Sequence, residues 1–151
     1  MSDDNIWSDE WGKQEEDWSG GGGRGKRLPR SDELGASVYE LDPGNFVVYH
    51  FHHLWEELLI VLRGTPTLRT PEEERRLDEG DVVHFPVGPA GAHALTNETD
   101  SPVRYVMAST GGAPEVVEYP DLGQITVQAR TGSQTGDQLW FIYDVPRSAD
   151  S

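Results

Sequence analysis

The sequence predicts an all-β protein, folded as an antiparallel sandwich or barrel. Short runs rich in β-branched and aromatic residues alternate with segments that contain glycine and proline, and these runs recur at regular spacing. No stretch shows a convincing helical period, and no unit of roughly 20–50 residues repeats along the chain. The length of 151 residues suits one domain with its own core.

The middle of the chain carries most of the predicted strands, and two strand-like pieces follow toward the C-terminus. Turns separate them, because residues 42–44, 63–66 and 79–80 combine Asp, Pro and Gly in ways that favour tight turns. The charged run 71–76 is predicted to be a solvated hairpin tip. The predicted strands are 36–41, 46–52, 57–62, 66–69, 81–85, 93–97 and 102–108, and the strand-like pieces are 115–119 and 139–144.

We divide the chain into three parts: a flexible, acidic and glycine-rich N-terminal arm (1–34), a barrel core (35–110) and a C-terminal extension whose strands pack on the barrel (111–151). Within the arm, the glycine-rich run 19–27 is interpreted as a flexible linker. No strand is predicted before it and no Gly-Lys-Ser/Thr follows it, so it does not match a phosphate-binding loop.

Three tryptophans precede this linker, and two interpretations of them stay open. Trp7, Trp11 and Trp18 are spaced by four and seven residues, which would place them on one face of a helix. Tryptophan is rarely left in water without a reason, so the arm either packs on the barrel or a partner subunit, or is a disordered tail.

The composition limits the partners of the protein. The formal net charge is −15, and such a surface repels nucleic acid and anionic lipid. The chain has two lysines and ten arginines. A composition with abundant Asp and Glu and few Lys resembles that of proteins from salt-loving organisms. The alternative is an ordinary acidic bacterial protein. No apolar run approaches the roughly 20 residues that cross a bilayer, and the acidic first residues do not resemble a secretory signal, so we expect a cytoplasmic protein.

The chain has no cysteine, which excludes disulfides, thiolate nucleophiles and Cys-ligated metal sites. All five histidines instead fall between residues 50 and 93. Because side chains alternate along a strand, His50 and His52 share a face with Phe46 and Val48, while His53 points the other way.

The next strand begins at Glu57, which shares a face with Leu59 and Val61, and His93 opens a later strand. If the first two strands pair antiparallel, both histidines lie near Glu57, and a closed barrel brings His93 opposite them. Three imidazoles and one carboxylate suit one divalent ion of Zn, Fe, Mn, Ni, Co or Cu.

These residues resemble the first motif of the cupin superfamily. That motif has a glycine, five residues, His-x-His, three or four residues, Glu, six residues and a glycine. Here Gly44 is followed after five residues by His50 and His52, four residues separate His52 from Glu57, and Gly64 follows after six more. The spacing selects Glu57 over its neighbour Glu56 as the ligand.

The second cupin motif is also present. Gly80 is followed after five residues by Pro86 and Gly88, and then by His93 and Asn97. The loop between Gly88 and His93 holds four residues where the usual pattern has two, and this lengthens the loop that carries the third histidine.

The resemblance covers about residues 36–110 and is closest to small single-domain cupins of the cupin 2 type. It implies a double-stranded β-helix, or jelly-roll barrel, which is often a homodimer, with one metal ion held inside by His50, His52, Glu57 and His93. We expect the pocket beside the metal to be lined by Phe46, Val48, Leu59, Val61, Leu95 and Asn97, although Asn97 also suits a turn-capping role. His53 and Glu56 are predicted to be exposed, and the orientation of His84 stays open.

Three functions stay open, because a fold does not fix a reaction. An enzyme would act on a small organic substrate, either as a dioxygenase with a redox metal or as an isomerase or decarboxylase, with Glu57 as ligand or as base. Sugar-phosphate isomerisation is disfavoured, because no basic residue is predicted at the inward positions. The alternatives are a non-catalytic barrel that binds a small ligand as a sensor, and a metal-free barrel.

Overall fold

The structure is a computed structural model, and it describes residues 2, 4–11, 23–130 and 138–146. These ranges hold twelve strands and one short 3₁₀ helix. No helix within them is long and apolar enough to span a bilayer. The elements are β1 (Gly23–Arg27), β2 (Leu34–Leu41), β3 (Phe46–His52), β4 (Glu57–Arg63), β5 (Thr67–Arg69), β6 (Glu74–Arg76), β7 (Val82–Phe85), η1 (Pro89–Gly91), β8 (His93–Thr96), β9 (Val103–Thr110), β10 (Glu115–Tyr119), β11 (Gln124–Arg130) and β12 (Gln138–Asp144).

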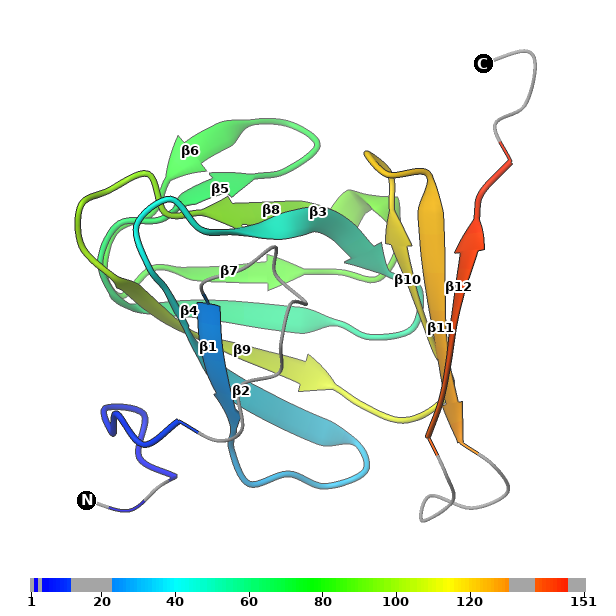
Figure 1. Ribbon diagram of the computed structural model, residues 1–151, viewed down its shortest axis with the longest axis horizontal. Coiled ribbons are helices and arrows are strands. Elements are labelled where there is room, and N and C mark those ends of the chain that lie inside the picture. The colour runs from blue at the N-terminus through cyan, green and yellow to red at the C-terminus, as the bar shows by residue number, and fades with distance from the viewer. Residues whose placement is uncertain (1, 3, 12–22, 131–137, 147–151) are drawn as a thin grey trace.

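The strands form two sheets that face each other across the core (Figure 1). The five-stranded sheet has the order β1-β2-β9-β4-β7, and the seven-stranded sheet has the order β12-β11-β10-β3-β8-β5-β6. The paired strands of both sheets run antiparallel, and neighbours in a sheet are mostly distant in sequence. This is the double-stranded β-helix that the sequence predicted.

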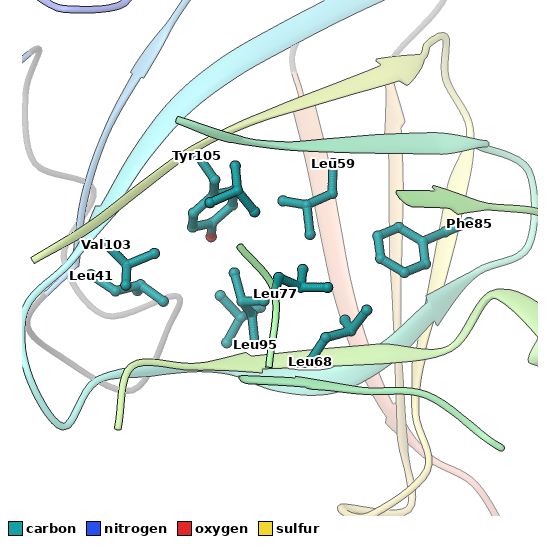
Figure 2. Packing of buried hydrophobic residues seen from close by; sticks show 10 residues of the cluster. Leu41, Leu59, Leu68, Leu77, Phe85, Leu95, Val103 and Tyr105 are labelled. Atoms are coloured by element: carbon teal, nitrogen blue, oxygen red, sulfur yellow. The ribbon is translucent and has the colours of Figure 1, made fainter. Parts of the chain in front are cut away.

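The core lies between the two sheets and consists of alternate residues from facing strands. Leu59 and Tyr105 come from the five-stranded sheet, and Leu68 and Leu95 come from the seven-stranded sheet (Figure 2). Each of the four side chains is at most 3% exposed. Truncating one of these buried leucines to alanine costs about 2–5 kcal/mol, because the lost apolar contacts leave a cavity. The packed core therefore holds the strands on which the histidines lie.

Every strand predicted from the sequence is present. Those predicted at 46–52 and 115–119 have the observed bounds, and each of the others begins or ends within two residues of the predicted position. Three strands were not predicted, namely β1, β6 and β11. Part of the run 71–76 is strand β6, which pairs with β5, so the solvated hairpin tip is shorter than expected.

The linker predicted at 19–27 is wrong for its second half. Gly23–Arg27 forms β1, and all five residues pair with β2; residues 19–22 lie outside the described ranges. Gly25 explains the close pairing, because a Cβ atom at this position would lie 2.6 Å from the ring of Tyr39. A glycine that suggested flexibility therefore permits a tight approach between backbone and aromatic ring.

Part of the N-terminal segment packs on the barrel. The ring of Trp11 lies 4.8 Å from the Arg104 guanidinium, and that of Trp7 lies 5.6 Å from the Arg63 guanidinium. Arg104 also pairs with Asp9. No helix forms over 4–11, and Trp18 lies outside the described residues. Of the two interpretations, the contacts of Trp7 and Trp11 favour packing on the barrel.

Candidate metal centre

Three strands bring the predicted ligands together. β3 carries His50 and His52, β4 begins at Glu57, and β8 begins at His93. β3 and β8 are paired with His50 directly opposite His93, and the two ring centroids lie 4.5 Å apart. The four side chains therefore meet at one end of the space between the sheets.

The histidine rings are oriented so that their Nε2 atoms are available to a common centre. The Nδ1 atom of His50 lies 2.6 Å from the Val48 carbonyl oxygen, and Nδ1 of His93 lies 2.8 Å from that of Gly91. A proton on Nδ1, donated to the carbonyl, leaves the lone pair on Nε2 free for a metal ion.

The carboxylate of Glu57 is the point of convergence. Its Oε1 atom lies 3.0 Å from Nε2 of His52 and 3.3 Å from Nε2 of His93. Ligand atoms of His50, His52 and Glu57 all lie within 4.8 Å of one another, so these three form the compact group, and His93 stands beside Glu57.

Several polar atoms of this cluster are buried without a well-formed hydrogen bond. They include both ring nitrogens of His52, Oε1 of Glu57 and Nε2 of His93. Burying unsatisfied polar groups costs several kcal/mol, and one divalent ion would satisfy the Nε2 atoms and the carboxylate oxygen together. The donor set of imidazole nitrogen and carboxylate oxygen therefore fits a transition metal, whose identity the residues do not select.

The pKa values of the two histidines of β3 are shifted in opposite directions. Burial and the neighbouring His93 lower the pKa of His50 to about 3. Burial also opposes the charged form of His52, but the contacts with Glu115 and Glu57 outweigh it and raise the pKa of His52 to about 9. Burial alone would raise the pKa of Glu57, yet its close contacts with His52 and His93 and their charge hold it well below its usual range.

The cluster opens onto a cavity of about 1430 Å³. Aromatic and apolar side chains cover its walls, including Tyr39, Tyr105 and Met107 from the five-stranded sheet. The C-terminal extension contributes Tyr119 and Trp140. A pocket with this lining has room for a small organic molecule.

Three of the six predicted pocket residues line this cavity: Val48, Leu59 and Leu95. Phe46 is not among the lining residues and is 43% exposed. A register shift in the pairing of β3 with β8, between Val47 and His50, explains this, because it breaks the alternation that placed Phe46 on the histidine face.

The other two predicted pocket residues are buried away from the cavity lining. Val61 belongs to the hydrophobic core. Asn97 is fully buried, and its amide donates hydrogen bonds to the carbonyl oxygens of Leu41 and Ser101. Asn97 therefore holds a turn, which is the second role that the sequence allowed.

The remaining polar residues near the motif lie on the outside. His53 is exposed and its Nε2 lies 3.0 Å from Glu118. His84 is exposed as well, and its Nε2 lies 2.8 Å from Glu56. The alternation along β3 therefore places His52 inward and His53 outward, as the sequence indicated, and His84 faces the solvent.

Sequence reasoning missed two residues that contact His52. The Trp55 ring stacks on the His52 ring, with centroids 5.7 Å apart. Oε1 of Glu115 lies 3.4 Å from Nδ1 of His52. The sequence places Glu115 on the same strand face as Val117 and Tyr119, but no spacing rule relates it to His52.

Comparisons with known proteins agree with this architecture. Residues 37–109 match the cupin domain family. The chain is similar to a sugar phosphate isomerase of the cupin superfamily from Silicibacter pomeroyi, at 24% identity and a TM-score of 0.70, over 85% of this chain and 82% of that chain. A candidate sugar phosphate isomerase from Acidithiobacillus ferrooxidans is similar at 25% identity and a TM-score of 0.64, over 81% of each chain.

A third solved structure, the polyketide cyclase RemF from Streptomyces resistomycificus, is 20% identical, with a TM-score of 0.53 over 58% of this chain and 64% of that chain. No protein with a curated description matches the sequence. The match of residues 37–109 to the cupin domain family, the two-sheet architecture and the fold of these neighbours all support a cupin fold for this part of the chain.

Proposed function

We propose that the protein is a metal-dependent enzyme that isomerises a small, anionic hydroxy-carbonyl compound. The observation that carries the proposal is the convergence of histidine Nε2 atoms on Glu57, with buried atoms left unsatisfied, at the end of a large cavity. His50, His52, Glu57 and His93 would hold the metal. A bound divalent ion acts as a Lewis acid that polarises substrate oxygens.

The low pKa of Glu57 favours a ligand role over that of a general base. A carboxylate that stays ionised far below neutral pH takes up a substrate proton poorly, because catalytic bases work best with a pKa near the operating pH. Tyr119 lines the same cavity, and burial raises the pKa of its hydroxyl, so this group is protonated at neutral pH. Tyr119 can therefore donate a hydrogen bond or a proton to a substrate oxygen.

Basic side chains in the cavity wall support an anionic substrate. Arg27 ends β1 and Arg30 follows it; both are exposed and both line the cavity. Lys26, the residue before Arg27, also lines the cavity. Its Nζ donates hydrogen bonds to the carbonyl oxygens of Asn5 and Ser8. A guanidinium pairs well with a phosphate or carboxylate.

These arginines remove the objection to a sugar phosphate that the sequence raised. That objection was that no predicted inward position carries a basic residue, whereas β1, a strand that was not predicted, places Arg27 at the cavity wall. The similarity to proteins described as sugar phosphate isomerases points to the same substrate class.

The test begins with protein purified without a histidine tag and loaded with Zn²⁺, Mn²⁺ or Fe²⁺. We expect proton NMR in D₂O to show interconversion of an aldose phosphate and its ketose, with deuterium entering the carbon next to the carbonyl. The reaction should stop in His50→Ala. Oxygen uptake by the iron form with diketones or catechols would favour a dioxygenase instead, and tight binding without turnover would favour a ligand-binding module.

A matched pair of variants tests the anionic substrate. Arg27→Gln removes a cation from the cavity wall, whereas Arg75→Gln removes one from the exposed β6, where Arg75 pairs with Glu73. Because a charged hydrogen bond contributes about 1.5–3 kcal/mol, we expect KM for the phosphorylated substrate to rise at least about tenfold in Arg27→Gln. Equal KM values in both variants would exclude Arg27 from substrate binding.

A further inference from the structure

Glu115 is a buried acidic residue that lies outside both histidine motifs and outside the matched range 37–109. It is the first residue of β10, it is 1% exposed, and it lines the cavity that contains the histidines. We propose that Glu115 is a positioning residue for His52, which fixes this ring so that Nδ1 carries the proton and Nε2 faces the metal. The inference rests on the proposed metal site.

Strand pairing explains how Glu115 reaches His52. β10 pairs antiparallel with β3, with Val117 opposite His52. Glu115 lies two residues from Val117 on the same strand face, so it is a diagonal neighbour of His52, and such neighbours are within reach of a long side chain. The backbone N–H of His53 donates to the Val116 carbonyl oxygen at 2.9 Å, which holds this register.

The carboxylate of Glu115 has little else to bind. Both of its oxygens are buried without a hydrogen-bond partner among the described residues. The single ion-pair contact described for it is that between Oε1 and Nδ1 of His52, at 3.4 Å. Burying a carboxylate costs free energy unless the carboxylate is paired. The position of Glu115 beside the imidazole of His52 therefore indicates that its contact with His52 has a role in the site.

The three histidines of the site differ in what faces their Nδ1 atoms. His50 and His93 each face a backbone carbonyl, of Val48 and Gly91 respectively, whereas His52 faces the carboxylate of Glu115. A carboxylate that accepts the Nδ1 proton fixes the ring orientation and makes Nε2 a stronger donor to a metal. Substituting such partners lowers metal affinity by about 10- to 100-fold.

Three variants of β10 test the assignment. Glu115→Gln keeps the shape but removes the charge, Glu115→Asp keeps the charge on a shorter arm, and Glu118→Gln removes the neighbouring carboxylate, which pairs with exposed His53. Circular dichroism checks that each variant folds. Calorimetric titration with Co²⁺ then gives the dissociation constant and stoichiometry, and the visible spectrum of the Co²⁺ complex reports its geometry.

We expect Glu115→Gln to bind one Co²⁺ with about 10- to 100-fold weaker affinity, Glu115→Asp to recover part of the loss, and Glu118→Gln to match the wild type. In the Zn²⁺-loaded protein labelled with ¹⁵N-histidine, the Nδ1–H signal of His52 should exchange slowly with solvent, and faster in Glu115→Gln.

Unchanged affinity and exchange in Glu115→Gln would overturn the inference while leaving the metal site in place. Loss of all binding in Glu115→Gln, together with a changed Co²⁺ spectrum in Glu115→Asp, would make Glu115 a ligand and also overturn it. Absence of metal binding in the wild type would overturn the proposed function and this inference together.

Discussion

His50 and His93 are direct partners across the β3–β8 pair, although 42 residues separate them along the chain. Their rings lie 4.5 Å apart at the centroids, and each donates from Nδ1 to a nearby backbone carbonyl. One strand pairing therefore brings the two motifs together, and the candidate metal centre depends on this pairing.

The first prediction concerns the ligands. His50→Ala and Glu57→Ala should each lower the metal content sharply, because the compact group loses one of its three members. His53→Ala is the matched control, since its side chain is exposed and pairs with Glu118 on the outer face. Metal analysis after purification without a tag measures all three. Equal losses of metal in the three variants would contradict the assignment of His50 to the inner face and of His53 to the outer face.

The second prediction concerns proton release on metal binding. In the metal-free protein His52 holds a proton up to a pKa of about 9, whereas His50, with a pKa of about 3, is already neutral at pH 7. A metal must displace the proton from Nε2 of His52, so affinity should rise by up to about tenfold per pH unit between pH 7 and 9. Calorimetry in buffers of different ionisation enthalpy should show about one proton released at pH 7. A flat affinity across this range would contradict the prediction.

The third prediction concerns the stability of the chelated protein. The pKa of His52 is raised from 6.5 to about 9, so its stabilising contribution is fully present below pH 6.5 and is lost as pH rises through 9. The pKa of His50 is lowered to about 3, so stability is lost as pH falls from 6.5 toward 3. Thermal unfolding with EDTA should show a maximum between these limits, and His52→Gln should flatten the alkaline side. A midpoint that keeps rising to pH 9 would be inconsistent with the charged His52.

The fourth prediction concerns β1. A methyl group at Gly25 would meet the Tyr39 ring at 2.6 Å, so Gly25→Ala should destabilise the protein by about 1–3 kcal/mol through overpacking. Gly35→Ala in β2 is the control, because its added Cβ would have only ordinary contact with Ser109 at 3.8 Å. Urea unfolding measures both. Equal stability of the two variants would mean that β1 does not lie against Tyr39.

Local patterns were enough to predict most of the fold and to predict that His50, His52 and Glu57 lie together. β4 and the end of β3 at His50–His52 alternate inward and outward residues, and the spacing from His52 selected Glu57, which lies beside His52, over Glu56, which lies on the outside. Fixed geometry within a strand and its turn makes such inferences possible.

Features that depend on distant partners were not predictable in this way. β1 was missed because its glycines suggested a linker, and its structure comes from pairing with β2 and contact with Tyr39. Phe46 was misplaced because a register shift in the pairing of β3 changes the face on which it lies. Glu115 was missed because a single acid has no spacing rule, and the pairing of β10 with β3 alone brings it to His52.

The most direct test of the metal centre is an anomalous diffraction map of crystals grown from tag-free protein loaded with Zn²⁺. We predict one peak per chain, about 2.0–2.2 Å from Nε2 of His50, His52 and His93 and from a carboxylate oxygen of Glu57. A map with no peak among these side chains, or with zinc bound only at the exposed His53 or His84, would contradict the account.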